Sequence, residues 1–283
     1  MNLRTIFTAA ALAFAVATAS AAEATFDRTL TTGSTPNVSV ATGSGNIHLH
    51  SGSDTQVHIL ARVHSSHGWM SGDVDSRIQQ IVHNPPIVQT GNDITIGERH
   101  NQDLYRNISI DYDVTLPHAS ALTTTTGSGD ITIENVGASL KAQSGSGNVH
   151  AQGIHGPAIL GTGSGDIDFQ QTAPGDIKAE TGSGNIILRG ISGALKSSTG
   201  SGDITVDGQP TSDWKLGTGS GNIHLSVGTA HFNLDADTGS GSINIAQPIT
   251  MQGSMNRHHV NGSVNGGGSI IRASTGSGDI EIK

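Results

Sequence analysis

The sequence predicts an all-β protein, a single-stranded parallel β-helix (β-solenoid) of about 18–19 residues per coil. The first observation is a repeated motif, Thr-Gly-Ser-Gly-Asp/Asn-Ile-x-Ile, whose copies between residues 126 and 238 follow in steps of 18, 18, 19, 18, 19 and 20 residues. The second is the alternation of apolar and polar residues after each turn, which is typical of half-buried strands. Copies begin at residues 126, 162, 181, 199, 218, 238 and 275, a Ser-led copy at 144, an outlying copy at 42 and a degenerate copy at 90.

A coil of this length suits two short strands joined by two turns, because helix-based repeats need more residues. A glycine on each side of the serine allows a sharp change of direction where a Cβ atom would clash. When coils stack in register, equivalent side chains form ladders about 4.8 Å apart.

The position after the second glycine predicts one such ladder, in which carboxylates and amides alternate. The alternation separates like charges, which on adjacent rungs would repel by roughly 1 kcal/mol even in water. We therefore interpret the ladder as structural. Its members are Asp130, Asn148, Asp166, Asn185, Asp203 and Asn222, followed along the chain by Ser242.

Two columns before the turn are expected to face the core. The first contains large side chains and the second, two residues later, small ones, so that a narrow interior closes without voids. The large column consists of Leu122, Leu140, Ile177, Leu195, Trp214, Leu234 and Ile271, and the small column of Thr124, Ala142, Ala179, Ser197, Ala236 and Ala273.

The chain divides into three predicted segments. Residues 1–21 have Arg4, a short apolar run and Ala19-Ser20-Ala21, which together predict a secretory signal peptide. Residues 22–117 are expected to contain the strands and the helix that cap the N-terminal end of the solenoid, and residues 118–283 the regular array. We expect 22–283 to form one continuous domain.

One helix is predicted, over residues 71–83. Ser71 can cap its N-terminus, and Asp73 and Asp75 complement the helix dipole in the first turn. The segment 84–86, Asn-Pro-Pro, ends it. Its apolar face consists of Val74, Ile78, Ile81 and Val82.

Composition restricts the function. The net charge is −9, which disfavours a nucleic-acid partner. The chain contains no cysteine, so an exported protein of this kind would be stabilised by packing and ladders rather than disulfides. After the signal peptide, we expect no segment that spans a membrane.

The sequence resembles a bacterial family in three features. They are the motif copies, the entry segment 112–117 (Tyr-Asp-Val-Thr-Leu-Pro), and the terminal segments 265–268 (Asn-Gly-Gly-Gly) and 275–279. This is the exported "putative adhesin" family of unknown function, and the resemblance covers nearly all of the predicted mature chain. It implies a right-handed parallel β-helix, and it implies no catalytic residues.

The outward position three residues before the motif threonine forms a possible anionic-ligand stripe. Its lysines are Lys141, Lys178, Lys196 and Lys215, and the same column contains Ile159, Asp235 and, last along the chain, Arg272. Such a stripe suits an anionic polysaccharide or lipid headgroups. The alternative is that the lysines keep a flat strand face soluble, and the sequence favours this simpler explanation.

We predict no catalytic residues, no metal site and no cofactor. Calcium-binding nonapeptide repeats place Asp two residues after the second glycine, whereas here Asp follows directly. The fourteen histidines are expected to be exposed, and no single column supplies three metal ligands. The acids that a polysaccharide-cleaving β-helix would need are expected to be scattered over different columns: Asp168, Asp207, Asp213, Asp235 and Asp237.

Three functions stay open. The first is a non-enzymatic, adhesin-like interaction module of the cell envelope or surface, which would use a flat face or the irregular segment 251–268. The second is a polysaccharide-binding or polysaccharide-degrading protein. The third is an envelope-stress or scaffold component that binds an envelope protein through an unpaired strand edge of the C-terminal coil. The export signal implies the periplasm, the cell surface or secretion.

Overall fold

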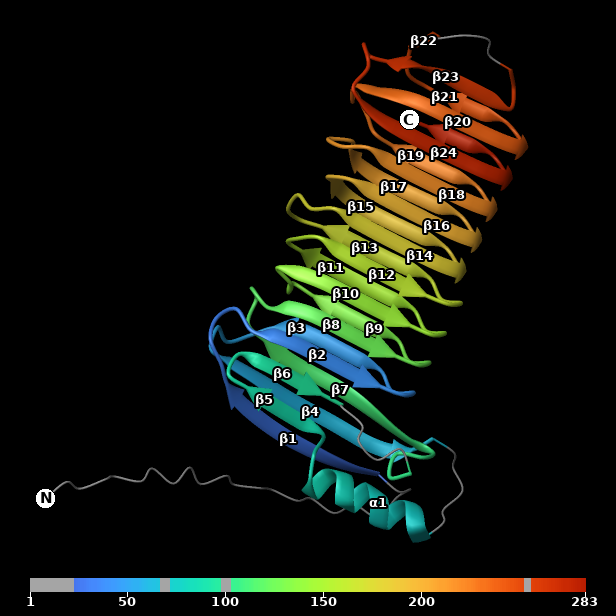
Figure 1. Cartoon of the computed structure of the whole chain (residues 1–283). Helices are drawn as coiled ribbons and strands as arrows, with labels where there is room; N and C mark the ends of the chain where they lie inside the picture. The colour runs from blue at the N-terminus through green and yellow to red at the C-terminus, as the bar shows by residue number, and fades with distance from the viewer. Residues whose placement is uncertain (1–22, 67–71, 98–102, 252–255) are drawn as a thin grey trace, which may run out of the picture.

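The protein is an elongated stack of short strands with one helix at its N-terminal end, as the computed structural model shows (Figure 1). The structure describes residues 23–66, 72–97, 103–251 and 256–283. The predicted signal peptide and the predicted cap Ser71 therefore lie outside the described residues.

Two long sheets form the two walls of the solenoid. Sheet A has twelve strands, in the spatial order β1 (Glu23–Thr31), β4 (Gln56–Ser65), β7 (Ile108–Leu116), β3 (Ile47–Ser51), β9 (Ile131–Glu134), β11 (Val149–Ile154), β13 (Ile167–Gln171), β15 (Ile186–Ser192), β17 (Ile204–Gln209), β19 (Ile223–Ser226), β25 (Ile280–Ile282) and β21 (Ile243–Ile245). Sheet B has thirteen, in the order β22 (Ile249–Met251), β23 (His259–Val264), β20 (Phe232–Ser240), β24 (Ser269–Ser277), β18 (Trp214–Ser220), β16 (Leu195–Ser201), β14 (Ile177–Ser183), β12 (Ala158–Thr162), β10 (Ser139–Ser144), β8 (Ala121–Thr126), β2 (Asn37–Thr42), β6 (Asp93–Ile96) and β5 (Ile87–Thr90).

The parallel β-helix predicted from the motif spacing is confirmed. Successive coils pair in parallel, residue on residue, so that Leu195, for example, lies beside Ile177 on one side and Trp214 on the other. Strands are antiparallel only toward the two ends, where β1, β4 and β7 pair in sheet A, β5 pairs with β6, and β23 pairs with β20 and β22 in sheet B.

The degenerate motif copy at residues 90–96 is one of these exceptions. Thr90 pairs with Asp93 across an antiparallel hairpin between β5 and β6, so this glycine turn joins two strands of sheet B, whereas the other motif turns lead from sheet B to sheet A. The second strand of the hairpin, β6, pairs in parallel with β2. Gly91 takes a positive φ of 62°, which suits a tight hairpin.

The order of coils along the axis differs from their order along the chain at both ends. Near the N-terminus, the coil β2–β3 lies between β6–β7 and β8–β9. Near the C-terminus, the last coil, β24–β25, lies between β18–β19 and β20–β21. The prediction that the C-terminal coil presents an unpaired strand edge is therefore wrong, because both of its strands are paired on both sides.

The predicted core columns are confirmed. Every residue of the large column is at most 3 % exposed, and the small column is equally buried. In β12 the sizes are exchanged, with Ala158 in the large column and Leu160 in the small one, so the coil keeps its total volume. The Trp214 indole N–H donates a hydrogen bond of 3.0 Å to the Gly193 carbonyl, which satisfies its one polar group.

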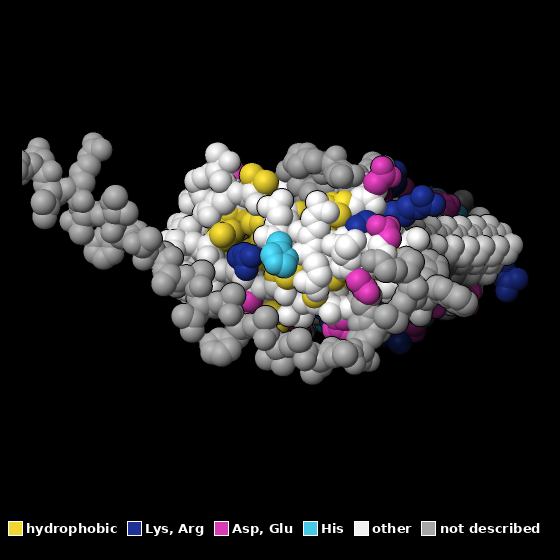
Figure 2. Space-filling model, turned by 90° about the horizontal axis from the view of Figure 1, so that it is seen from below, with side chains coloured by type: hydrophobic (Ala, Val, Ile, Leu, Met, Phe, Trp, Pro, Cys, Tyr) yellow, Lys and Arg dark blue, Asp and Glu magenta, His cyan; other side chains and the backbone are white. Residues whose placement is uncertain are grey.

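The predicted helix is present as α1 (Gly72–His83), and it covers the N-terminal end of the core against β1 and β4. Val74, Ile78 and Ile81 are buried, as its apolar pattern predicts. Arg77 fixes the helix to the next segment, because its Nη1 donates to the carbonyl oxygens of Asp103 (3.1 Å) and Arg106 (2.7 Å). Seen from this end, the surface carries small groups of hydrophobic side chains among polar ones (Figure 2).

Candidate functional site

The polar ladder at the motif turn is longer than the sequence order suggested. Because β24–β25 lies between β18–β19 and β20–β21, Asp279 rather than Ser242 follows Asn222. In each rung the backbone N–H donates to the side-chain Oδ1 of the neighbouring rung. In spatial order the side chains are Asp111, Asn46, Asp130, Asn148, Asp166, Asn185, Asp203, Asn222, Asp279 and Ser242.

The alternation of carboxylate and amide is therefore unbroken from Asp111 to Asp279. Hydrogen bonds to the carboxylates are 2.7–2.8 Å long, and those to the amides are 2.9–3.0 Å. This is the difference expected for charge-assisted bonds. One oxygen of each carboxylate, Oδ1, accepts a backbone hydrogen bond from the neighbouring rung, so the ladder acts as a structural brace.

The motif threonine braces the same turn from inside. Thr199 Oγ1 donates to the Gly184 carbonyl of the neighbouring coil at 3.0 Å, and equivalent bonds recur along the column. These threonines are buried, as expected for a column that points into the turn. The turn glycines have no room for a side chain, since a Cβ atom on Gly129 would lie 1.9 Å from the Gly45 carbonyl oxygen.

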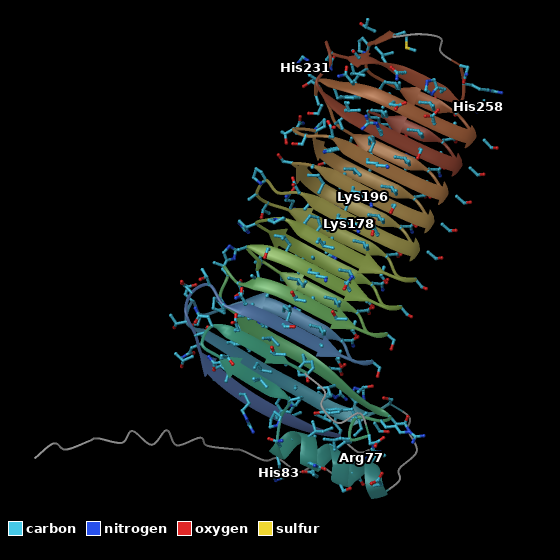
Figure 3. The ribbon with its side chains drawn as sticks, in the orientation of Figure 1. Arg77, His83, Lys178, Lys196, His231 and His258 are labelled. Carbon is cyan, nitrogen blue, oxygen red and sulfur yellow. The ribbon has the colours of Figure 1, made fainter. Side chains whose placement is uncertain are left out.

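The predicted basic stripe lies on the outer face of sheet B, and Lys178 and Lys196 lie one above the other there (Figure 3). The interleaved order of coils lengthens the run of adjacent cations, because β24 places Arg272 directly beside Lys215, and Asp235 lies one rung further along. Four consecutive rungs are therefore cationic: Lys178, Lys196, Lys215 and Arg272. We call these four residues the basic stripe; Lys141 lies one rung beyond Ile159 in the same column.

Two carboxylates contact the basic stripe. Glu180 Oε2 lies 2.7 Å from Lys178 Nζ, and its Oε1 lies 3.1 Å from Lys196 Nζ. The hydrogen bond from Lys178, with a smaller contribution from Lys196, holds the pKa of the Glu180 carboxyl below its ordinary value. Asp235 approaches Arg272 at 3.9 Å. Among the described residues, no carboxylate within 4 Å pairs with Lys215.

Small residues follow three of the four cations two positions further along the strand, whereas Glu180 follows Lys178. The neighbouring outward column has Ser198, Gly217 and Ser274 beside the last three cations, and Gly161 beside Ile159. The two glycines differ from the turn glycines, because a Cβ atom would have room: its nearest neighbours would be 3.6 Å away at Gly217 and 3.9 Å away at Gly161. Packing within the chain therefore does not require glycine at either position.

Four histidines occupy outward positions on the strands of sheet A, as predicted: His48, His50, His150 and His224. His64 and His259, expected in irregular segments, lie instead on β4 and β23. His150 Nδ1 lies 3.6 Å from Asp168, the pair expected from the sequence, and His224 Nδ1 lies 3.2 Å from Glu281. These side chains are about two-fifths exposed, so each pair contributes little to stability.

The expectation that ligand-type side chains do not converge is wrong at two places. His48, His50 and Asp113 bring three ligand atoms within 4.8 Å of one another, and so do the side chains of Asp235, Asp237 and His259. In the first set the strands β3 and β7 are neighbours through the interleaved order, and in the second β20 and β23 are neighbours through antiparallel pairing at the C-terminal end. The sequence signals were the His-x-His and Asp-x-Asp alternations, but the strand pairing that joins them was not predictable from the repeat.

The acids considered for polysaccharide cleavage are scattered, as expected, except for Asp235 and Asp237, whose carboxylates converge with His259. Asp168 pairs with Arg189 and faces outward on sheet A. Asp213 accepts a hydrogen bond of 2.9 Å from the Ile270 backbone N–H on sheet B. Within the part of the chain that the structure describes, no helix has the length and apolar character needed to cross a bilayer.

Comparison with known proteins identifies the family and the fold. The family described as Toastrack DUF4097 matches residues 83–283. The chain is similar to three solved structures: a "putative adhesin" from Bacteroides fragilis (15% identity, 92% of this chain and 97% of that chain, TM-score 0.48), a "putative cell adhesion protein" from Clostridium sporogenes (11%, 92% and 99%, 0.27) and a "Putative lipid binding protein" from Parabacteroides distasonis (14%, 92% and 96%, 0.49). No curated protein sequence matches the chain. At these identities and scores, the structural similarities carry no information about function.

Proposed function

We propose that this chain, which belongs to the Toastrack DUF4097 family, is an exported, non-enzymatic binding module whose basic stripe holds an extended anionic polysaccharide. Export is the expectation from residues 1–21, and the polysaccharide is the proposal that the outer face of sheet B supports best. The observation that carries it is the row of four adjacent cations on an otherwise acidic protein.

The lysines are concentrated beyond what solubility requires. The chain has five lysines, and four of them lie in this single column, with only Lys283 elsewhere. Lysines that merely discourage aggregation would serve equally well on either sheet. A column of cations at one strand spacing instead matches a linear polymer that presents an anionic group about every 5 Å along the solenoid axis.

The glycines beside the stripe support a bound chain. Glycine inside a strand weakens it and often marks a place where a ligand approaches the backbone closely. Gly217 and Gly161 have room for a side chain but carry none, so the protein surface beside this column is lower at these two positions. A polymer over the stripe would lie in the resulting depression and contact the strand backbone.

The four cations span about 14 Å, or three steps of about 4.8 Å. A strip this narrow suits one extended chain better than a membrane surface, which would contact a broad face. Ile159 is the one large hydrophobic residue of this column that is exposed, at 46%, so few apolar side chains are available to enter a bilayer.

The test is binding of the purified protein to immobilised polygalacturonate at low ionic strength. The variant Lys178→Ser/Lys196→Ser/Lys215→Ser should bind at least tenfold more weakly, because three of the four cations are removed. Neutral dextran should not bind either protein. Phosphatidylglycerol vesicles form a second arm, and binding to vesicles but not to polygalacturonate would replace the polysaccharide by lipid headgroups and overturn the proposal.

A matched control removes the same charge elsewhere. Arg28→Ser/Arg189→Ser/Lys283→Ser takes three cations from outside the stripe, all from exposed positions. This control should bind polygalacturonate within about twofold of the unaltered protein. Equal loss in both triple variants would show that net charge alone is responsible, and the basic stripe would then not be a binding site.

A further inference from the structure

A second possible site lies on the other sheet, at the N-terminal end. His48 and His50 project from the same face of β3, since they are two residues apart, and Asp113 of β7 is the register partner of His48. His48 Nδ1 lies 3.4 Å from Asp113 Oδ2, and His50 Nδ1 lies 3.4 Å from Asp113 Oδ1. The two imidazole rings are 5.0 Å apart between centroids, so both face the one carboxylate.

His50 has an unused ligand atom. Its Nδ1 is buried and has no hydrogen-bond partner among the described residues, although Asp113 lies close to it. The opposite ring nitrogen, Nε2, lies 2.8 Å from Thr115 Oγ1. When Nε2–H donates to this hydroxyl, Nδ1 is unprotonated and its lone pair is free, which is the tautomer that a metal ion requires.

The donor set indicates the class of ion. Two imidazoles and one carboxylate suit Zn²⁺ and related transition metals, whereas Ca²⁺ and Mg²⁺ prefer oxygen ligands alone. Tetrahedral Zn²⁺ with bonds of about 2.1 Å places its ligand atoms about 3.4 Å apart, since the edge of a tetrahedron is about 1.63 times the centre-to-corner distance. Each imidazole Nδ1 has this separation from one oxygen of the Asp113 carboxylate, His48 from Oδ2 and His50 from Oδ1.

The surroundings also favour a cation. Glu134 Oε2 lies 3.9 Å from His48 Nε2, and a hollow beside His48 and Asp113 is lined in addition by Asp111, Asp130 and Arg62. The Arg62 guanidinium is paired with Glu23, so the carboxylates in this hollow outnumber the cation. The side chains of His48, His50 and Asp113 are 41%, 34% and 49% exposed, so solvent can reach a further coordination position.

We propose that His48, His50 and Asp113 bind one divalent transition-metal ion of the Zn²⁺ class, with the remaining coordination position open to water or to a ligand group of a partner. The ion would join β3 to β7, which are adjacent in the sheet although these ligands are 65 residues apart in the chain. It would therefore fasten the interleaved N-terminal coil.

The other cluster of ligand-type side chains does not share these properties. His259 Nδ1 is hydrogen-bonded to Asp237 at 2.6 Å, shorter than the 3.4 Å between His48 Nδ1 and Asp113, and Asp235 pairs with Arg272 at 3.9 Å. It also offers one imidazole rather than two. This cluster serves as an internal comparison.

The experiment is calorimetric titration of Zn²⁺ into the purified protein, prepared without a histidine tag and freed of metal by a chelator. We expect one Zn²⁺ per chain and a higher thermal midpoint in its presence. His50→Gln and Asp113→Asn should each weaken binding at least tenfold and abolish the thermal shift. His150→Gln, a histidine on the same sheet face with a single carboxylate neighbour, should bind as the unaltered protein does.

Circular dichroism shows whether each variant is folded, and the altered side chains lie on the outer face, so we expect all of them to fold. If one ligand variant fails to fold, the other gives the answer. Co²⁺ provides an independent readout, because a tetrahedral site gives intense visible absorption that His50→Gln should lose. Absence of stoichiometric Zn²⁺ binding, binding that survives His50→Gln and Asp113→Asn, or loss in His259→Gln instead would each overturn the assignment.

Discussion

Replacing Asn185 by Asp tests whether the alternating ladder stabilises the fold. The new carboxylate would lie between Asp166 and Asp203, one rung from each, and could still accept the hydrogen bond that Asn185 Oδ1 now accepts from the Asp203 N–H at 3.0 Å. The shape of the ladder is therefore kept and only the charge changes.

The magnitude follows from the rung spacing. Two unit charges about 4.8 Å apart repel by about 0.9 kcal/mol at the dielectric constant of water, so two neighbours give about 1.7 kcal/mol. The hydrogen bond to residue 185 becomes charge-assisted and recovers part of this, about 0.5 kcal/mol. We expect Asn185→Asp to lower the free energy of unfolding by about 1 kcal/mol, measured by urea denaturation at pH 7 and low ionic strength.

The control is the same substitution in a background that lacks the neighbouring charges. In Asp166→Asn/Asp203→Asn, the change Asn185→Asp restores a carboxylate with two amide neighbours and should not be destabilising. In 1 M salt the Debye length falls to about 3 Å, so the cost in the unaltered background should largely disappear. An equal cost in both backgrounds, or no effect of salt, would refute the electrostatic explanation of the alternation.

Three further predictions concern the stripe and the interleaved coils. Glu180→Gln should strengthen polygalacturonate binding roughly fourfold, because a carboxylate about 5 Å from a bound anion costs about 0.8 kcal/mol in water; no change in affinity would place the polymer elsewhere. The pKa of Glu180 is lowered in the folded protein by Lys178 and Lys196. The small contribution of Glu180 to stability is therefore present above its unfolded pKa and is lost as the pH falls through its folded pKa. Over the same fall in pH, polygalacturonate binding should strengthen in the unaltered protein but not in Glu180→Gln. Gly217→Thr should raise the free energy of unfolding by up to about 1 kcal/mol, since threonine suits a strand better than glycine. It should also weaken polygalacturonate binding, because the new side chain would stand between the polymer and the backbone. A stable variant with unchanged affinity would contradict a close approach of the polymer to the backbone. Deletion of residues 269–283 should abolish cooperative folding of the C-terminal coils, because it removes the strands that join β20 and β21 to β18 and β19. A deletion variant whose thermal midpoint matches that of the full chain would show that these strands are not needed there.

The repeat made most of the fold predictable. Fixed spacing, the glycine turn and the inward columns depend on local stereochemistry and on period, and both are visible in a single sequence. The helix was equally accessible, because its acidic first turn, its apolar face and the following prolines are contiguous. These features require no knowledge of which coil lies beside which.

The order of the coils was not predictable, for a physical reason. Strands β20 and β24 present almost the same inward pattern, Leu234 and Ala236 in one and Ile271 and Ala273 in the other. Either strand can therefore pack against Trp214 of β18, and the core alone does not select between them. The exposed strand edge expected at the C-terminus was wrong for this reason, and the metal-type cluster at His48 escaped notice because β3 and β7 are adjacent only through the interleaving at the other end.

The arrangement that the protein adopts is informative about the outer face. With coils stacked in chain order, Asp235 would lie beside Lys215 and the two would attract by about 0.9 kcal/mol across one rung in water. In the observed order Arg272 lies beside Lys215 instead, and the two cations repel by a similar amount. Asp235 then pairs only with Arg272, the last cation of the basic stripe. The polar ladder gains from this order, because Asp279 extends its alternation beyond Asn222. Lysines whose purpose was solubility would gain nothing from an uninterrupted row of like charges, whereas a polyanion that bridges adjacent rungs would. Glu180 and Asp235 relieve the repulsion at Lys178, Lys196 and Arg272, so Lys215 is the cation at which the proposed polyanion would act most strongly.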